Sequence, residues 1–197
     1  MHRPLRLPAA LVLGCIAATA FADGDPAAGK IRFETCRGCH SVPGYANAFP
    51  NYHVPKIAGQ HASRIVAALQ GYKSGERSHT TMHAQAASLS DQDIQDVAAY
   101  LAALGAPVAA ASTATPPEKV EKVCKACHGP DGNAPAQDFP VLAGQHHDYL
   151  LQALKQYRDG QRSNVLMAPN VKGMSDAELR ELAAWFAAQA GPLQAVP

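Results

Sequence analysis

Two short stretches, Cys36-Arg-Gly-Cys39-His40 and Cys124-Lys-Ala-Cys127-His128, decide how this chain folds. Both have the spacing C-x-x-C-H, which is the attachment motif for c-type haem. On a helical turn, two thiols three residues apart project from one face and reach the two vinyl groups of one porphyrin, and the following His points over the same ring. The repeated motif therefore predicts two covalently bound haem c groups. The predicted thioether positions are Cys36, Cys39, Cys124 and Cys127, and the predicted proximal iron ligands are His40 and His128.

Cysteine pairs at this spacing also occur as redox-active dithiols and as halves of zinc sites. Cys124 lies 88 residues after Cys36, much farther than in compact zinc modules, and a zinc site leaves the repeated His without a role. The fifth cysteine, Cys15, lies in the N-terminal segment. Haem attachment therefore explains the four remaining cysteines better than zinc binding or disulfide formation.

The N-terminal segment has the pattern of a secretory signal peptide. A basic start is followed by an apolar run over residues 7–20 and an A-x-A site that ends at Ala22. The run is too short to span a bilayer. We expect residues 1–22 to be removed and the chain to be exported to the periplasm. In the alternative, a partial lipoprotein-type site ending at Cys15 anchors the protein to a membrane face.

The composition is that of a globular protein. The chain has 197 residues, of which 47% are hydrophobic and 17% charged, which excludes a disordered or collagen-like chain. Its formal net charge is +1, from 17 Lys and Arg against 16 Asp and Glu, and it becomes −1 when the two Arg of the signal peptide are removed. Because there is no basic surplus to neutralise phosphates, nucleic acid is excluded as a partner.

An internal repeat defines the domain organisation. Pro55-Lys-Ile-Ala-Gly-Gln-His61 recurs 85 residues later as Pro140-Val-Leu-Ala-Gly-Gln-His146. Between the copies lies an uncharged segment rich in Ala and Pro, which is typical of a linker. The expected parts are one domain over residues 23–106, a linker over 107–116 and a second domain over 117–197.

Each half shows helical periodicity, and strand signals are nearly absent. Asp25-Pro26 predicts a helix start, and an apolar stripe over residues 62–74 predicts a further helix. Ser90 and Ser175 begin capping-box sequences that predict a last helix in each half. The fold class is therefore all-α, with a few helices around one haem in each of two tandem domains. The haem supplies the buried apolar surface that a half of fewer than ~100 residues lacks.

The second axial ligand decides what a haem does. Met82 and Met167 hold equivalent positions in the repeat, each eight residues before the Ser that begins the last helix. We place both in loops, from which a thioether can lie over the distal face of the ring. Met174 is better explained as a core residue beside a helix start. His79 and His83 flank Met82 and are alternative ligands that would lower the potential of that haem.

With these motifs, each half resembles a class I cytochrome c, and the pair resembles the dihaem cytochrome c4 family over nearly all of the chain after the signal peptide. The resemblance implies the axial pairs His40–Met82 and His128–Met167. It further implies that proximal His side chains donate to backbone carbonyls and that arginines lie near haem propionates, although solvated surface charges explain these arginines equally well. The residues concerned are Pro55, Pro140, Arg77 and Arg162. In the second copy Glu121 replaces Phe33, which predicts weaker packing of its first helix.

Iron ligated by both His and Met has no open position, so such a site passes single electrons and binds no substrate. We therefore expect an electron-transfer protein rather than an enzyme, one that carries electrons between a respiratory or periplasmic dehydrogenase and a terminal oxidase or other acceptor. The expected partners are redox proteins, with possible peripheral membrane association. Two alternatives stay open: the haem-bearing subunit of a larger, flavocytochrome-like oxidoreductase, and a dihaem peroxidase.

Overall fold

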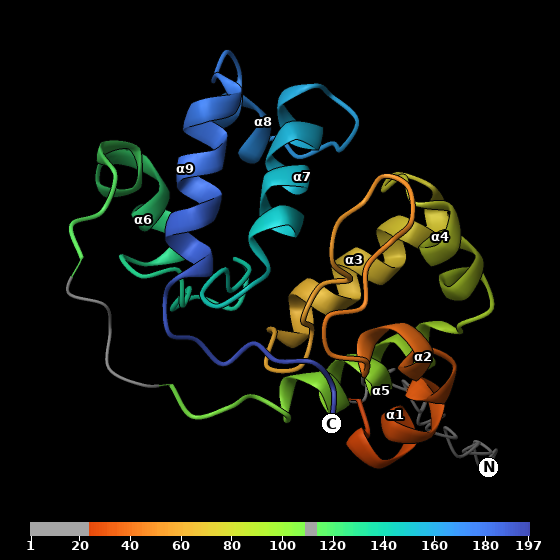
Figure 1. Cartoon of the computed structure of the whole chain (residues 1–197). Coiled ribbons are helices and arrows are strands. Elements are labelled where there is room, and N and C mark those ends of the chain that lie inside the picture. The colour runs from red at the N-terminus through yellow and green to blue at the C-terminus, as the bar shows by residue number, and fades with distance from the viewer. Residues whose placement is uncertain (1–23, 109–113) are drawn as a thin grey trace, which may run out of the picture.

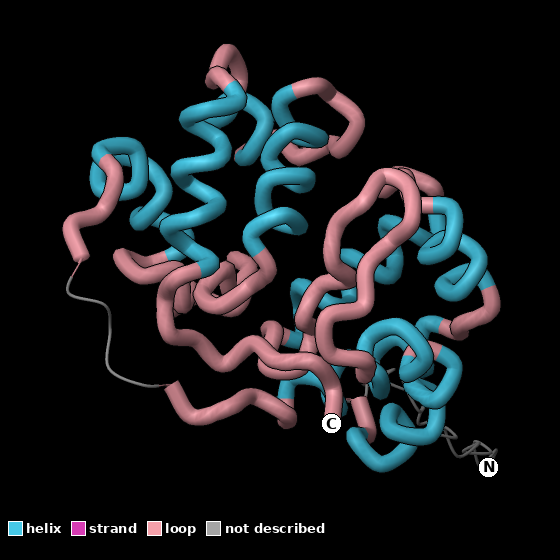
Figure 2. Tube along the Cα trace, in the orientation of Figure 1, coloured by secondary structure: helices cyan, strands magenta, loops and turns pink. Residues whose placement is uncertain are grey.

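The computed structural model describes residues 24–108 and 114–197, and its regular structure is helical (Figure 2). The expected signal peptide, its cleavage site and Cys15 lie outside these residues, as does the middle of the expected linker. Extended pairing in the described part is limited to isolated bridges between single residues. None of the helices found there has the length and apolar character needed to cross a bilayer.

The helices form two groups that lie side by side (Figure 1). The first group contains α1 (Pro26–Arg32), the 3-10 turn η1 (Phe33–Thr35), α2 (Arg37–His40), α3 (Ala62–Ser74), α4 (Thr80–Ala87) and α5 (Asp91–Ala102). The second contains the π-helical turn η2 (Val120–Cys124), α6 (Lys125–His128), α7 (His147–Arg158), α8 (Met167–Val171) and α9 (Asp176–Ala187).

Local capping explains where several helices begin. Asp25 accepts a hydrogen bond from the Ala27 N–H, and Pro26 is the first residue of α1. Ser90 is the N-cap of α5 and Ser175 the N-cap of α9, each with both hydrogen bonds of a capping box in place. The predicted starts of these three helices are therefore confirmed.

The first half is organised around the crossing of α1 and α5. Gly29 makes this crossing possible, because a Cβ at this position would lie only 2.0 Å from the carbonyl oxygen of Asp96 on α5. Phe33 follows on the same side and is fully buried, with its ring 5.7 Å from that of Tyr100. The C-x-x-C-H motif in α2 therefore directly follows a segment that is tightly packed against α5.

In the second half, a different residue packs the first helical turn against the last helix. Glu121 is exposed and pairs with Lys125, whereas Val120 is 0% exposed and packs with Leu182 and Phe186 of α9. The chain is π-helical here, and Val120, rather than the residue aligned with Phe33, faces the core. Glu121 thus makes no contribution to the core of the second half, in contrast to Phe33 in the first.

The C-terminal tail returns from the second half to the first, as the blue segment of Figure 1 shows. The backbones of Gln194 and Ala58 exchange hydrogen bonds of 3.3 and 3.2 Å, and the Val196 N–H donates to the His40 carbonyl at 3.0 Å. Val196 is 1% exposed and belongs to the core of the first half. The two halves are therefore joined by shared core as well as by the linker.

Candidate haem-binding site

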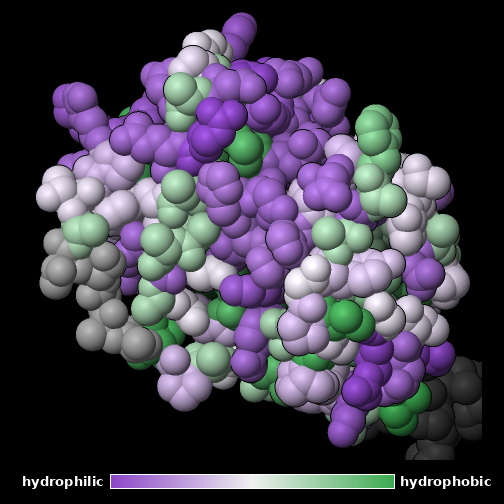
Figure 3. Space-filling view, viewed as in Figure 1, coloured by the Kyte–Doolittle hydropathy of each residue, from purple (hydrophilic) through white to green (hydrophobic). Residues whose placement is uncertain are grey.

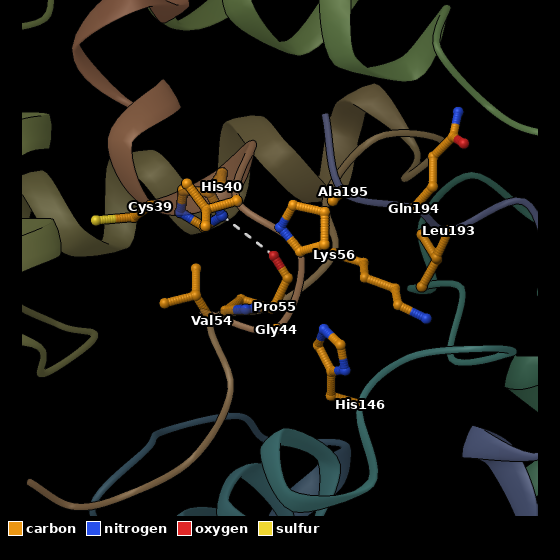
Figure 4. Close-up of a pocket in the computed structure, with 12 residues that line it drawn as sticks. Cys39, His40, Gly44, Val54, Pro55, Lys56, His146, Leu193, Gln194 and Ala195 are labelled. Atoms are coloured by element: carbon orange, nitrogen blue, oxygen red, sulfur yellow. Dashed lines mark hydrogen bonds between the residues drawn. The ribbon is translucent and has the colours of Figure 1, made fainter. Parts of the chain in front are cut away.

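The two predicted proximal histidines end short helices and are held in the same way. His40, the last residue of α2, is buried, and its Nδ1–H donates to the Pro55 carbonyl at 3.1 Å (Figure 4). His128, the last residue of α6, donates to the Pro140 carbonyl at 3.1 Å. Burial lowers the pKa of both imidazoles, although each carbonyl bond works against that shift. Each ring is thus neutral, fixed by Nδ1, and left with Nε2 for iron.

The predicted thioether cysteines lie on the same helical turns as the histidines. All four are partly buried. Cys36 packs against the core of the first half and Cys124 against that of the second. Burial raises the pKa of both of these thiols, so they stay protonated at neutral pH. The arrangement suits thiols that add to vinyl groups during maturation better than a standing thiolate site.

The two cysteine pairs do not meet. They lie in α2 and α6, which belong to different helix groups in Figure 1. Across residues 24–108 and 114–197, no three His, Cys, Asp or Glu side chains gather as ligands for a bare metal ion. The alternative of one zinc bound by four thiolates is therefore wrong for this structure.

Met82 and Met167 lie in helices and not in loops, which corrects the sequence interpretation. Met82 is in the first turn of α4, and Met167 is the first residue of α8. In each case the side chain three positions earlier accepts a hydrogen bond from the methionine N–H, and for α4 that residue, His79, is the N-cap. The Met82 N–H donates to His79 Nδ1 at 3.2 Å, and the Met167 N–H donates to Asn164 Oδ1 at 2.9 Å. This side-chain acceptor fixes the backbone at each methionine.

The capping contact also gives the flanking histidines a structural role. The Nδ1 atom of His79 is used by the Met82 N–H, and His83 donates from Nδ1 to the Tyr72 carbonyl at 2.7 Å. Burial lowers the pKa of His79, and the positive charge of Arg77 adds to the effect. Met174 packs against the second core, as the sequence analysis expects.

Arg77 and Arg162 meet between the two halves. Their backbones form an isolated bridge, and each guanidinium lies over a tyrosine ring of its own half, Arg77 over Tyr72 at 4.4 Å and Arg162 over Tyr157 at 4.6 Å. Arg77 Nη2 also donates to the Tyr149 hydroxyl of the other half at 3.0 Å. Both arginine side chains are partly buried rather than fully exposed.

The arginine cluster lacks matching anions. Arg64 joins Arg77 and Arg162 at the interface, and its Nε is buried without a hydrogen-bond partner. Among the described residues, no carboxylate lies within ion-pair distance of these three guanidinium groups. Burial alone would raise the pKa of Tyr149, but the charges of Arg77 and Arg162 lower it. Partly buried cations of this kind need anionic partners, and the propionates of haem are carboxylates of suitable charge.

Comparison with family models assigns both halves to haem proteins. Residues 26–105 match the model described as cytochrome c. Residues 111–186 match the model described as cytochrome c oxidase, cbb3-type, subunit III. The two matches coincide with the two helix groups.

Individual proteins resemble the whole chain. Cytochrome c4 of Stutzerimonas stutzeri is 38% identical over 201 residues, which cover 89% of this chain and 94% of the relative. The thiosulfate dehydrogenase electron acceptor of Stutzerimonas stutzeri strain A1501 is 34% identical over 209 residues, 95% of this chain and 94% of the relative. The crystal structure of reduced recombinant cytochrome c4 from Pseudomonas stutzeri has a TM-score of 0.69 at 29% identity and covers 84% of this chain and 99% of that chain.

Proposed function

Because this chain belongs to the cytochrome c4 family, whose members are electron-transfer proteins with two haem c groups, we propose that it is a periplasmic carrier of single electrons. It takes electrons from a respiratory or periplasmic dehydrogenase and delivers them to a terminal oxidase or another acceptor. We place its domains at residues 23–106 and 117–197, joined by the linker 107–116.

The proposal rests on one observation, which is that the two proximal histidines make the same hydrogen bond to a proline carbonyl. The hydrogen bonds from His40 to Pro55 and from His128 to Pro140 have the same length, 3.1 Å, in halves whose cores differ. A fixed, neutral imidazole with a carbonyl on Nδ1 is what a permanent iron ligand requires. When bound, each haem supplies one-electron redox chemistry.

We assign three roles to the side chains around each proposed haem site: covalent attachment, axial ligation and neutralisation of the propionates. Cys36 and Cys39 attach the first haem and Cys124 and Cys127 the second, by thioether bonds. His40 with Met82, and His128 with Met167, are the proposed axial pairs. Arg77 and Arg162 neutralise propionates between the halves, where Tyr149 ties Arg77 in place.

The axial assignment is tested with methionine variants of the holoprotein. Met82→Ala and Met167→Ala should each abolish one half of the far-red absorption band that arises from methionine-to-iron bonding, and each should lower one reduction potential. Met174→Ala is the matched control and should keep both halves of the band. An unchanged band in Met82→Ala would contradict the assignment and move the ligand to His79 or His83.

The choice of partners follows from the surface. The face seen in Figure 3 is mostly hydrophilic, with hydrophobic residues scattered between polar ones. Phe49 is 95% and Val165 88% exposed, and the net charge is close to zero. We therefore propose weak, partly apolar docking with little electrostatic steering. The similarity to an electron acceptor of thiosulfate dehydrogenase supports a dehydrogenase of that kind as one candidate donor.

A reduction assay separates the candidate roles. We expect a purified thiosulfate dehydrogenase to reduce the oxidised protein, and the rate to change little with added salt because few charges are involved. Stable copurification with a catalytic subunit would replace the free-carrier proposal with the subunit alternative. Rapid peroxide turnover by the reduced protein would favour the peroxidase alternative.

Mass spectrometry of the intact exported protein tests its processing. The mass should match a chain cleaved after Ala22 plus two haems, whereas a lipid adduct on Cys15 would show anchoring.

A further inference from the structure

Each repeated P-x-x-A-G-Q segment ends in a glutamine whose side chain reaches the other half of the molecule. Gln145 of the second half exchanges two hydrogen bonds with the backbone of Lys56 in the first. Its Oε1 accepts from the Lys56 N–H at 3.0 Å, and its Nε2 donates to the Lys56 carbonyl at 2.8 Å. Gln145 is 5% exposed, so this exchange takes place away from water.

The opposite glutamine repeats the arrangement. Gln60 of the first half accepts from the Val141 N–H at 2.9 Å and donates to the Val141 carbonyl at 3.0 Å. Val141 and Lys56 hold the same position in the repeat, directly after Pro140 and Pro55. The two exchanges are thus reciprocal, as expected for two similar halves packed around a pseudo-twofold axis.

Each glutamine is also held by its own half. Oε1 of Gln145 accepts a second hydrogen bond from the His146 N–H at 2.9 Å, and Oε1 of Gln60 accepts one from the His61 N–H at 3.1 Å. These donors lie at the starts of α7 and α3, where backbone N–H groups have no partner within the helix. The backbone N–H at each helix start therefore holds the amide oxygen in the orientation that reaches across the interface.

One peptide group joins this contact to the proximal histidine. The carbonyl of Pro55 accepts from His40, and the N–H at the other end of the same peptide bond belongs to Lys56 and donates to Gln145. Figure 4 shows His40, Pro55 and Lys56 in this order beside the second-half residue His146. In the other direction, the peptide bond between Pro140 and Val141 links His128 to Gln60.

Hydrogen bonds in such a chain strengthen one another, because donation by the N–H polarises the peptide and makes its carbonyl a better acceptor. A better acceptor on Nδ1 increases the basicity of an iron-ligating imidazole. A more basic ligand favours the oxidised iron and lowers the reduction potential. We propose that Gln145 and Gln60 are positioning residues through which each half sets the potential of the haem in the other half, an inference that rests on the proposed roles of His40 and His128.

The test compares holoprotein variants with leucine, which has a similar size and no polar atoms. Gln145→Leu should raise the potential of the first-half haem, with a change of up to tenfold in its reduction equilibrium constant, about 59 mV for one electron. In the reduced protein, proton–nitrogen NMR should show the Nδ1–H resonance of His40 moving upfield and that of His128 unchanged. Gln60→Leu should reverse the pattern.

A matched control separates this effect from loosening of the interface. Gln194 also crosses between the halves, and its Nε2 donates to the Leu104 carbonyl at 2.6 Å rather than to either acceptor peptide. Gln194→Leu should leave both Nδ1–H resonances in place. Shifts in the haem of the same half, or equal shifts in both haems, would overturn the proposal.

A second variant keeps the proposal testable if the leucine variants do not fold. Gln145→Glu retains a strong acceptor for the Lys56 N–H and should lower the potential of the first-half haem, the opposite sign to Gln145→Leu. A raised or unchanged potential of the first-half haem in Gln145→Glu would refute the coupling. Failure of the proposed function is distinguishable, because a wild-type protein without two His–Met haems would reveal it before any variant is compared.

Discussion

The crossing of α1 and α5 at Gly29 gives a sharp prediction for the substitution Gly29→Ala. The new Cβ would lie 2.0 Å from the Asp96 carbonyl oxygen and 2.9 Å from the Tyr100 Cβ, where ordinary contact begins at 3.4 Å. The closest obstacle is backbone, which cannot rotate away. The two helices therefore have to move apart by more than an ångström.

Three terms set the size of the effect. Overpacking costs about 3 kcal/mol. Separation of the helices also weakens the 2.8 Å bond from the Asp25 N–H to the Asp96 carboxylate, about 1 kcal/mol. Replacing a helix-interior glycine with alanine returns about 1 kcal/mol. We expect a net decrease of about 3 kcal/mol in the free energy of unfolding.

Guanidinium unfolding followed by circular dichroism measures this change. With a slope of about 3 kcal/mol per M for a half of this size, the midpoint should fall by about 1 M. Gly38→Ala is the control, because a Cβ there meets nothing within 4 Å and the second copy has Ala126 at that position. A loss below about 0.5 kcal/mol in Gly29→Ala would refute the rigid crossing.

Two further predictions concern the second half. Hydrogen bonds from Lys155 and Arg158, each 2.7 Å long, lower the pKa of Asp176 to about 2. The ionised Asp176 carboxylate therefore stabilises the fold fully above its ordinary pKa near 3.8, and this stabilisation is lost as the pH falls through about 2. Asp176→Asn should flatten the dependence of the unfolding free energy on pH between these values. Asp91→Asn, which removes a single ion pair with Lys73, is the control, and equal curves for the two variants would contradict the prediction. Asn164→Ala removes the acceptor of the Leu166 and Met167 N–H groups at the start of α8 and should cost about 1 kcal/mol in guanidinium unfolding. Asn170→Ala is the control on the same helix, and similar midpoints for both variants would show that the Asn164 contacts contribute little.

The helical part of the fold was predictable because its signals are local. A capping serine, an apolar stripe or a C-x-x-C-H turn acts within a few residues, and the similarity to cytochrome c4 structures confirms the all-α class. The placement of Met82 and Met167 in loops was wrong. His79 and Asn164, whose side chains accept from the two methionine N–H groups, lie only three residues before them, so a search for such acceptors would have found the starts of both short helices.

By itself, the amino-acid sequence predicted two haem c groups and determined that the chain is a tandem repeat, because thiol and imidazole spacing on one helical turn is a local property. Only the tertiary structure decided what joins the halves. Gln145 meets Lys56 across 89 positions, Arg77 meets Tyr149 across 72, and Val196 completes the core around Phe33. These contacts depend on how the packed surfaces of the two halves fit together. The periodicity within each repeat does not show which residues of the two halves will face each other.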